Sequence, residues 1–263
     1  MINKKGDIMI DTHAHLNMKD FNEDIHQIIE KAKAKGLKQI IVIGMDEASS
    51  FKAIKLAETY EMVYATVGLH PGYVDGCDVS HIENLLNHPK VVGVGECGLD
   101  FYWTDENQAQ QEQAFLHQIK LSAQYQLPLV IHTRNSFDRA YEMVKPFKGK
   151  VSGVFHCFSS TLEDVKKAID LGFYIGIDGP ITFKKNEVLK EIILGMDLSY
   201  LLIETDSPYM TPTPFRGKRN EPSYLPYIAE KIAEIRGITL DEVIHITTEN
   251  TKRLFTKIGG NKT

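Results

Sequence analysis

The chain has 263 residues, of which 43% are hydrophobic and 25% are charged. These fractions are typical of a globular protein with a substantial core, and they argue against a disordered chain. The length suits one large α/β barrel of about 250 residues, and no long linker rich in Pro, Gly or Ser divides it. We therefore predict a single domain over residues 1–263, with a disordered tail over 258–263.

The charge and the cysteines narrow the possible functions. Lys and Arg number 30 against 35 Asp and Glu, so the net charge is −5 and a generally basic nucleic-acid-binding surface is excluded. The three cysteines show no CxxC spacing, so neither a disulfide framework nor a thiolate zinc site is indicated. Neither a signal peptide nor a run of 18 apolar residues is recognisable. We expect a cytoplasmic protein with no membrane contact and no obligate protein partner.

Short apolar runs alternate with helical patterns along the chain. The periodicity predicts eight strands, over residues 8–13, 39–44, 63–69, 91–97, 129–133, 151–157, 173–178 and 201–206. Parallel neighbours need crossover helices, so this alternation predicts a parallel sheet. An open doubly wound sheet usually has a Gly-rich phosphate turn after its first strand, which is missing here. We therefore predict an α/β fold, a single (β/α)8 TIM-type barrel with an extra C-terminal helix, which the capping-box pattern at residues 239–242 announces.

Polar side chains stand at the ends of six predicted strands. They are His13 and His15 on the first strand, His70 on the third, Glu96 on the fourth, His132 on the fifth, His156 on the sixth and Asp206 on the eighth. Because the carboxyl ends of barrel strands meet at one rim, these side chains should lie together. Residues two apart on a strand point to the same face, so the two histidines of the first strand can bind one ion.

Histidines and carboxylates on otherwise apolar strands point to a metal site. Taken singly, His132 or His156 is more often a hydrogen-bonded core histidine than a ligand, but the set together favours metal binding. Leaving His70 aside, six ligands exceed the three that a catalytic zinc generally takes, so we predict two divalent metal ions with Glu96 as the bridge. The sequence leaves the choice among Mg, Mn, Zn, Co and Ni open.

Several motifs occur together and in order. They are DTHAHLN at 11–17, GLHPG at 68–72, GECGLDFYW at 95–103, IHTR at 131–134, FHCFS at 155–159, ETDSPYMTP at 204–212 and RGKRNEPSY at 216–224. This ordered set resembles the TatD family of metal-dependent deoxyribonucleases, within the amidohydrolase-like metallohydrolases. The resemblance implies a TIM-type barrel with a two-metal site that hydrolyses DNA phosphodiester bonds, commonly from a 3′ end. It also implies that His13, His15 and Asp206 hold one metal, that His132 and His156 hold the other, and that Glu96 bridges them.

The predicted reaction is hydrolysis by a metal-activated water. Asp206 can both bind metal and accept the proton of that water, and Glu96 belongs to the same catalytic set. His70 is a candidate to donate a hydrogen bond to the phosphate or the leaving oxygen, and it is almost as well explained as a cap of the turn before Pro71.

Strand parity assigns supporting roles. Glu204 has the same strand parity as Asp206, so it should face inward one layer deeper and orient a ligand histidine. Asp11 should point inward beneath His13 and His15. The same parity sends Cys97 and Cys157 to the opposite face, where they should pack under helices.

We expect a DNA substrate that is single-stranded or a 3′ end, and on an acidic protein it needs local contacts. Arg134, Arg216 and Arg219 follow predicted strands at the metal rim and are candidates to clamp phosphates, although a short basic run is often only solvated. The aromatic run at 101–103 can stack on a base or pack within its loop. The alternatives are a metallohydrolase acting on a small phosphotriester, lactone or amide, and a barrel that binds without turnover. Phosphotriesterase-type enzymes typically bridge their metals with a carboxylated lysine, a position that Glu96 occupies here.

Overall fold

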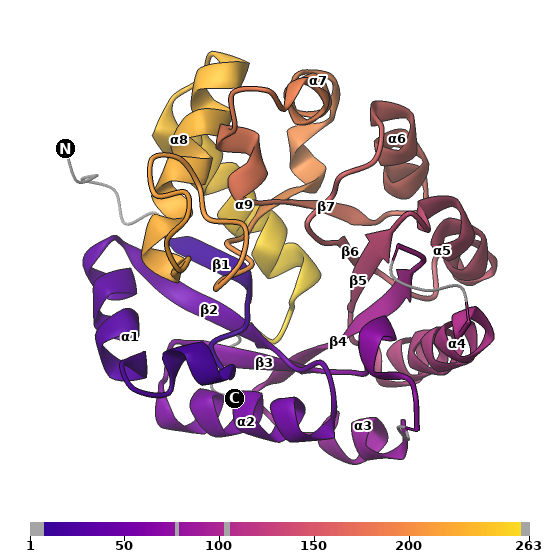
Figure 1. Cartoon of the computed structure of the whole chain (residues 1–263). Helices are drawn as coiled ribbons and strands as arrows, with labels where there is room; N and C mark the ends of the chain where they lie inside the picture. Colours follow the sequence, from indigo (N-terminus) through magenta and orange to yellow (C-terminus); the bar gives the residue numbers. More distant parts are fainter. Residues whose placement is uncertain (1–7, 77–78, 103–105, 259–263) are drawn as a thin grey trace.

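Eight parallel strands form the centre of the molecule (Figure 1). The structure is a computed structural model that describes residues 8–76, 79–102 and 106–258. The strands follow one another around the sheet in sequence order, and they are β1 (Met9–Ala14), β2 (Leu37–Ile43), β3 (Val63–Val67), β4 (Val91–Asp100), β5 (Leu129–Arg134), β6 (Gly153–Phe155), β7 (Tyr174–Ile177) and β8 (Leu201–Ile203). All eight predicted strands are present, so the predicted α/β barrel is confirmed.

The barrel closes between its first and last strands. Ala14 forms a parallel bridge with Ser207, the His15 amide donates to the Ser207 carbonyl at 2.7 Å, and the Asp206 amide donates to the His13 carbonyl at 2.9 Å. Closure therefore places the start of the chain beside residues about 190 positions later.

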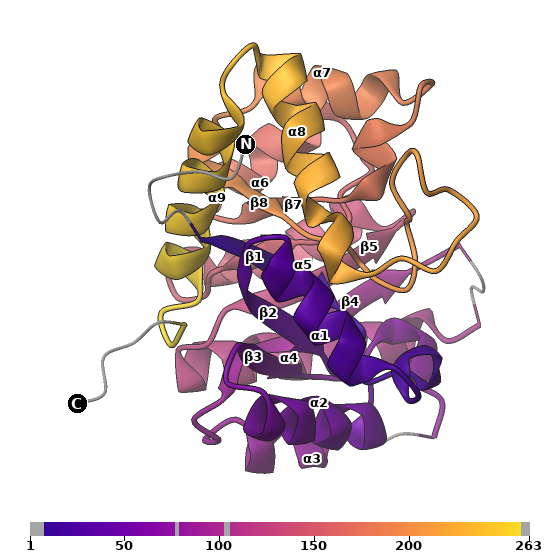
Figure 2. The same ribbon diagram turned by 90° about the vertical axis from the view of Figure 1, so that its left-hand side faces the viewer.

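Helices cover the outside of the barrel. They are α1 (Ile25–Ala34), α2 (Glu47–Thr59), α3 (Ser80–Leu85), α4 (Gln108–Tyr125), α5 (Phe137–Val144), α6 (Leu162–Asp170), α7 (Glu187–Gly195), α8 (Leu225–Arg236) and α9 (Leu240–Leu254). The predicted C-terminal helix is α9, and its capping box is formed by Thr239 and Glu242. Figure 2 shows the loop after β8 at one end of the barrel and α9 at the other. None of the described helices is both long and apolar enough to cross a membrane.

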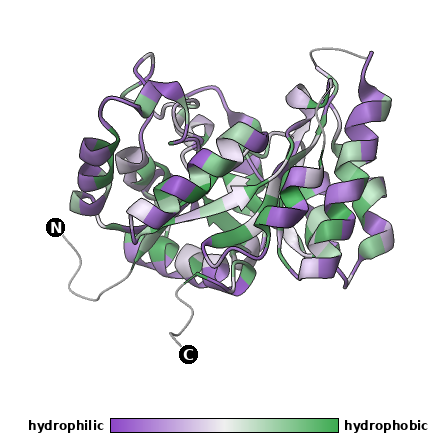
Figure 3. Cartoon of the chain, turned by 90° about the horizontal axis from the view of Figure 1, so that it is seen from below, coloured by the Kyte–Doolittle hydropathy of each residue, from purple (hydrophilic) through white to green (hydrophobic). Residues whose placement is uncertain are grey.

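Apolar side chains lie on both faces of the strands and form two hydrophobic clusters. One cluster of apolar side chains lies between strands and helices, which turn their hydrophilic faces outward (Figure 3). A smaller cluster includes Val130, Val154 and Leu202. These three residues precede His132, His156 and Glu204 by two positions, so they point the same way and form an apolar layer beneath the polar rim. Ile258, assigned to a disordered tail by the sequence analysis, is buried in this cluster, whereas residues 259–263 lie outside the described part of the chain.

Some strand ends differ from those predicted. β4 continues three residues beyond the expected end at Cys97, while β6 and β8 end before His156 and Asp206. β4 also has one residue more than β5 between Val94 and Cys97, and β1 has one more than β2 between Asp11 and Ala14. Such bulges re-aim side chains next to functional sites, and here they surround Glu96 and His13.

Candidate metal centre

His13 and His15 meet Asp206 where the barrel closes. The Nε2 atoms of the two histidines lie 3.2 Å apart, and Asp206 Oδ1 lies 3.6 Å from the first and 3.3 Å from the second. All three residues are buried. The backbone bonds across the β1–β8 seam hold this group, so the structure brings the predicted trio together.

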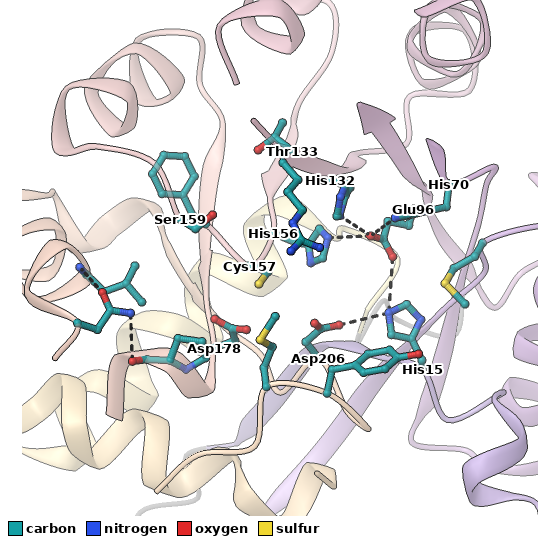
Figure 4. Close-up of a pocket in the computed structure, with 18 of the residues that line it drawn as sticks. His15, His70, Glu96, His132, Thr133, His156, Cys157, Ser159, Asp178 and Asp206 are labelled. Carbon is teal, nitrogen blue, oxygen red and sulfur yellow. Dashed lines mark hydrogen bonds and ion pairs between the residues drawn. The ribbon is translucent and has the colours of Figure 1, made fainter. Parts of the chain in front are cut away.

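Glu96 lies between two groups of histidines (Figure 4). Its Oε2 atom is 3.5 Å from His13 Nε2 and 3.6 Å from His15 Nε2. Its Oε1 atom is 2.8 Å from His156 Nε2 and 3.2 Å from His132 Nδ1. Each carboxylate oxygen thus faces a different pair of imidazoles, which is the arrangement expected of a bridging ligand.

A close backbone approach precedes Glu96 on β4. Gly95 has a φ of +145°, and a Cβ atom added there would lie 2.6 Å from the Val130 carbonyl oxygen. Only glycine suits both the conformation and the space. The Glu96 amide then donates to the Gly44 carbonyl at 2.7 Å, which ties the strand to the end of β2 while the carboxylate points to the histidines.

The buried donor set fits divalent metal ions. Glu96 Oε2 and the Nδ1 atoms of His13 and His15 are buried without a hydrogen-bond partner among the described residues. Leaving buried polar atoms unpaired is costly, and two imidazole Nε2 atoms at 3.2 Å beside two carboxylates form a natural set of cation ligands.

The protonation states of three candidate ligands favour metal binding. Burial lowers the pKa of His13, so its Nε2 lone pair is available. Burial would raise the pKa of Glu96, but the charge on His156 and neighbouring imidazoles hold it well below the ordinary range. Burial likewise opposes ionisation of Asp206, whose pKa is nevertheless lowered by a hydrogen bond from His15. Ligands must be deprotonated to bind metal, and His13, Glu96 and Asp206 meet that condition. Burial by itself would lower the pKa of His132 and His156, but contacts with Asp100, Glu96 and Glu204 raise it above the ordinary value, so a metal ion has to displace a proton from these two rings.

Asp100 supports His132, a role that the sequence analysis missed. Asp100 Oδ2 lies 3.0 Å from His132 Nε2, which turns the other ring nitrogen toward Glu96. A carboxylate behind a ligand histidine fixes both its ring orientation and its tautomer. Asp100 is four residues beyond Glu96, so strand parity would have indicated it if β4 had been predicted to its full length.

His70 caps the turn before Pro71 with one ring nitrogen and faces the centre with the other. Its Nδ1 atom accepts a hydrogen bond from the Gly72 amide at 3.0 Å, which caps the turn at Pro71–Tyr73. Its Nε2 atom lies 3.4 Å from Glu96 Oε1. Burial lowers the pKa of His70 to about 3, so the ring is neutral near pH 7. Because Nδ1 is the acceptor, the proton is on Nε2, and the ring presents a donor to the centre.

Glu204 lies beneath the centre, whereas Asp11 faces the other side of β1. The bulge between Asp11 and Ala14 breaks the parity that Asp11 would share with His13, so its predicted inward position is wrong. Asp11 accepts hydrogen bonds from the Thr205 amide at 2.9 Å and hydroxyl at 2.6 Å, and burial raises its pKa to about 7. It therefore joins β1 to the segment after β8. Glu204 Oε1 accepts the Cys157 amide at 2.6 Å and lies 3.7 Å from His156 Nδ1, so its close contact is with the backbone that follows the histidine.

The two cysteines do not share one environment. Cys97 is fully buried in the core between strands and helices, as predicted. Cys157 instead lines the cavity above the barrel, so its predicted packing under a helix is wrong. The reason is that β6 ends at Phe155 and Cys157 has a φ of +43°, so strand alternation no longer applies. Asp178, which follows β7, also lines the cavity, although the sequence analysis gave it no role.

The basic residues are divided between the cavity and the scaffold. Arg134 lines the cavity, and its guanidinium lies 3.9 Å from the centre of the Tyr102 ring. Arg216 stacks on Phe183 at 4.0 Å, outside the cavity lining. Arg219 forms a bidentate pair with Asp24, at 3.1 and 2.6 Å. Its side chain therefore anchors the loop after β8 to the start of α1, which corrects the prediction that it clamps phosphate.

The three aromatic residues at 101–103 do not share one environment. Phe101 packs against the core, Tyr102 is exposed beneath the arginine, and Trp103 lies outside the described residues. Loop packing therefore accounts for the first of the three.

The metal-ligand candidates form one side of a cavity of about 830 Å³ at the carboxyl ends of the strands. Its mouth carries exposed aromatic and apolar side chains, namely Tyr73, Val188, Tyr209 and Met210. The cavity therefore combines a polar floor of imidazoles and carboxylates with a largely apolar rim.

Comparisons with known proteins agree with this geometry. A family model described as TatD related DNase matches residues 10–256. A Bacillus subtilis protein named uncharacterized metal-dependent hydrolase YabD is 41% identical over 254 residues, covering 94% of this chain and 99% of the relative. An Edwardsiella piscicida protein named 3′-5′ ssDNA/RNA exonuclease TatD is 35% identical over 257 residues, covering 94% and 99%. The crystal structure of YJJV, a TatD homologue from Escherichia coli K12, superposes with a TM-score of 0.89 at 30% identity, covering 96% and 99%. The chain belongs to the TatD related DNase family.

Proposed function

We propose that this chain is a divalent-metal-dependent hydrolase that cleaves DNA phosphodiester bonds, acting as a 3′-5′ deoxyribonuclease on single strands or 3′ ends. The observation that carries the proposal is the position of Glu96, with one carboxylate oxygen toward each pair of imidazoles. Family membership and the exonuclease name of a relative support the same reaction class.

We assign two divalent ions to the centre. His13, His15 and Asp206 would hold one, His132 and His156 would hold the other, and Glu96 would bridge them. When bound, such ions supply Lewis acidity that acidifies water and neutralises developing charge on phosphoryl oxygens. Magnesium, manganese, zinc, cobalt and nickel are all candidates, because imidazole and carboxylate ligands are shared among their sites.

The chain's own side chains supply the remaining steps. The ionised Asp206 carboxylate is buried at the floor of the cavity and can accept the proton of the attacking water. His70 is neutral and directs its Nε2 proton into the same space, where it can donate to a phosphoryl or leaving oxygen. Asp100 holds His132 in one tautomer throughout. These residues thus divide proton transfer, phosphate contact and ligand orientation among them.

The shape of the cavity favours one unpaired nucleotide. Its volume of about 830 Å³ lies within the range of small-ligand sites, roughly 300–1,000 Å³. Tyr73 and Tyr209 stand exposed at its mouth, where a base can stack once it has left a duplex. Among the described residues that line the cavity, Arg134 is the one arginine or lysine, so it can contact a phosphate there. A paired base cannot reach these rings without unpairing, which is the basis for the single-strand preference.

A labelled-substrate assay tests the proposal. Metal-free protein is mixed with 3′-labelled single-stranded DNA, and magnesium, manganese, zinc, cobalt or nickel is added in turn. We expect release of the labelled mononucleotide with at least one ion, and a terminal phosphorothioate should block it. Long labelled fragments instead would indicate internal cleavage.

Matched variants connect the activity to the centre. Glu96→Gln should abolish cleavage, while Glu230→Gln, the same change at an exposed position on α8, should leave it unchanged. A parallel panel of lactones and phosphotriesters addresses the small-substrate alternative. Intact DNA with every ion, together with turnover of a lactone, would overturn the proposal.

A further inference from the structure

A third group of potential ligands lies beside the proposed two-metal centre. Cys157 Sγ and one carboxylate oxygen each from Asp178 and Asp206 lie within 4.8 Å of one another. The three residues follow β6, β7 and β8, so consecutive strands deliver them to one wall of the cavity. Figure 4 shows the sulfur atom above the two carboxylates.

The buried side chain of Asp178 has one carboxylate oxygen without a hydrogen-bond partner among the described residues. The residue is 1% exposed, and the unpaired oxygen is Oδ2. A buried carboxylate oxygen that has no donor is costly. The carboxylates of Asp206 and the fully buried Glu204 lie close by, so an ionised Asp178 would be repelled by both. A cation would pair with this oxygen and offset the repulsion.

Asp206 is suitably placed to be shared. Its Oδ1 atom faces His13 and His15, at 3.6 and 3.3 Å, and a carboxylate has a second oxygen on its other side. Asp178 and Asp206 place two carboxyl groups on this wall of a cavity that, under the proposed function, admits a polyanion. A cation between them would make this wall compatible with phosphate.

We propose that Cys157, Asp178 and Asp206 form an additional binding site for a divalent transition-metal ion of the zinc and cobalt class. A thiolate ligand selects such ions over magnesium and calcium, which prefer oxygen. Three protein ligands leave a coordination position open for water or a phosphate oxygen. The site goes beyond the two-metal proposal, and its test does not depend on nuclease activity.

Cobalt(II) is the probe, because a thiolate bound to cobalt gives a charge-transfer band in the near ultraviolet that imidazole and carboxylate ligands do not give. Metal-free, reduced protein is titrated with cobalt chloride under anaerobic conditions, and bound cobalt is counted after dialysis. We expect the band to appear. Cys157→Ser should remove it and lower the bound cobalt by one ion per chain, and Asp178→Asn should weaken it.

Cys97→Ser is the matched control, because Cys97 lies in the core and should leave both the band and the count unchanged. A measurement on wild-type protein covers the case of a variant that fails to fold: cobalt should slow iodoacetamide modification of Cys157, followed by mass spectrometry. Absence of the band at saturating cobalt, its persistence in Cys157→Ser, or unchanged modification of Cys157 would each overturn the proposal.

Discussion

Replacing Asp100 with asparagine should weaken metal binding without disturbing the barrel. The Asp100 carboxylate lies 3.0 Å from His132 Nε2 and also accepts the Tyr102 amide at 3.0 Å. The two bonds use different carboxylate oxygens, so asparagine, with one carbonyl oxygen, can keep the bond from His132 but loses the one from the Tyr102 amide, and it removes the charge. A hydrogen bond to a charged group contributes about 1.5–3 kcal/mol, and we take the lower end because asparagine retains a neutral bond. Since about 1.4 kcal/mol is a factor of ten, Asp100→Asn should lower metal affinity about tenfold.

The assay is a competition titration of metal-free protein with a chromophoric chelator, combined with single-stranded DNA cleavage at several metal concentrations. We expect the loss of activity to be largely recovered at high metal, because the substitution affects His132 rather than the reacting atoms. Asp138→Asn, an exposed change on α5, is the control. Unchanged metal affinity in Asp100→Asn, with an unchanged metal requirement for cleavage, would refute the role assigned to this carboxylate.

Three further predictions concern residues around the centre. His70→Ala should lower kcat about 100-fold, because it removes a hydrogen-bond donor to the transition state. The amount of bound metal, measured by elemental analysis, should not change. A loss of metal would instead make His70 a ligand. Arg219→Ala should cost about 1 kcal/mol of unfolding free energy at pH 7, and unchanged DNA cleavage would distinguish anchoring from phosphate binding. The hydrogen bond from Arg219 lowers the pKa of Asp24, so this stabilisation is present at neutral pH and lost as the pH falls through the folded-state pKa of Asp24. The unfolding free energies of wild type and Arg219→Ala, measured by urea titration, should therefore converge in acid. A difference that stays constant with pH would contradict the ion pair. Tyr209→Ala should raise KM for single-stranded DNA about fivefold or more, the equivalent of about 1 kcal/mol of lost stacking, whereas Tyr209→Phe should not, and equal effects would exclude stacking.

The barrel and the metal-ligand candidates followed from sequence because they depend on short-range periodicity. Apolar runs separated by helical patterns fix a parallel sheet, and the carboxyl ends of its strands must meet at one rim. That rule was sufficient to predict that His13 and Asp206 lie at one site, although they come from opposite ends of the sequence. The position of Glu96 at the end of the fourth strand then favoured it as the bridge over the modified lysine of related barrels.

The errors arose where the backbone leaves regular strand geometry. Asp100 was missed because β4 continues beyond the expected end, past a bulge that local patterns do not reveal. Cys157 was placed on the wrong face because its positive φ ends the alternation. Arg219 was assigned to substrate because its partner, Asp24, is 195 residues away and belongs to another βα unit. Each error depends on a tertiary contact or a backbone turn rather than on residue type.

The seam between β1 and β8 also determines the order in which this protein can be assembled. One half of the centre needs His13 and His15 from the start of the chain and Asp206 from near its end, held by backbone bonds across the seam. A chain emerging from the ribosome therefore lacks this half until its last strand has been made. Such long-range closure is slow to form, and an ion that binds the closed barrel but not the open one stabilises closure by mass action. We therefore expect the supply of metal to affect how much of the enzyme reaches its closed, folded form as well as how fast the enzyme turns over.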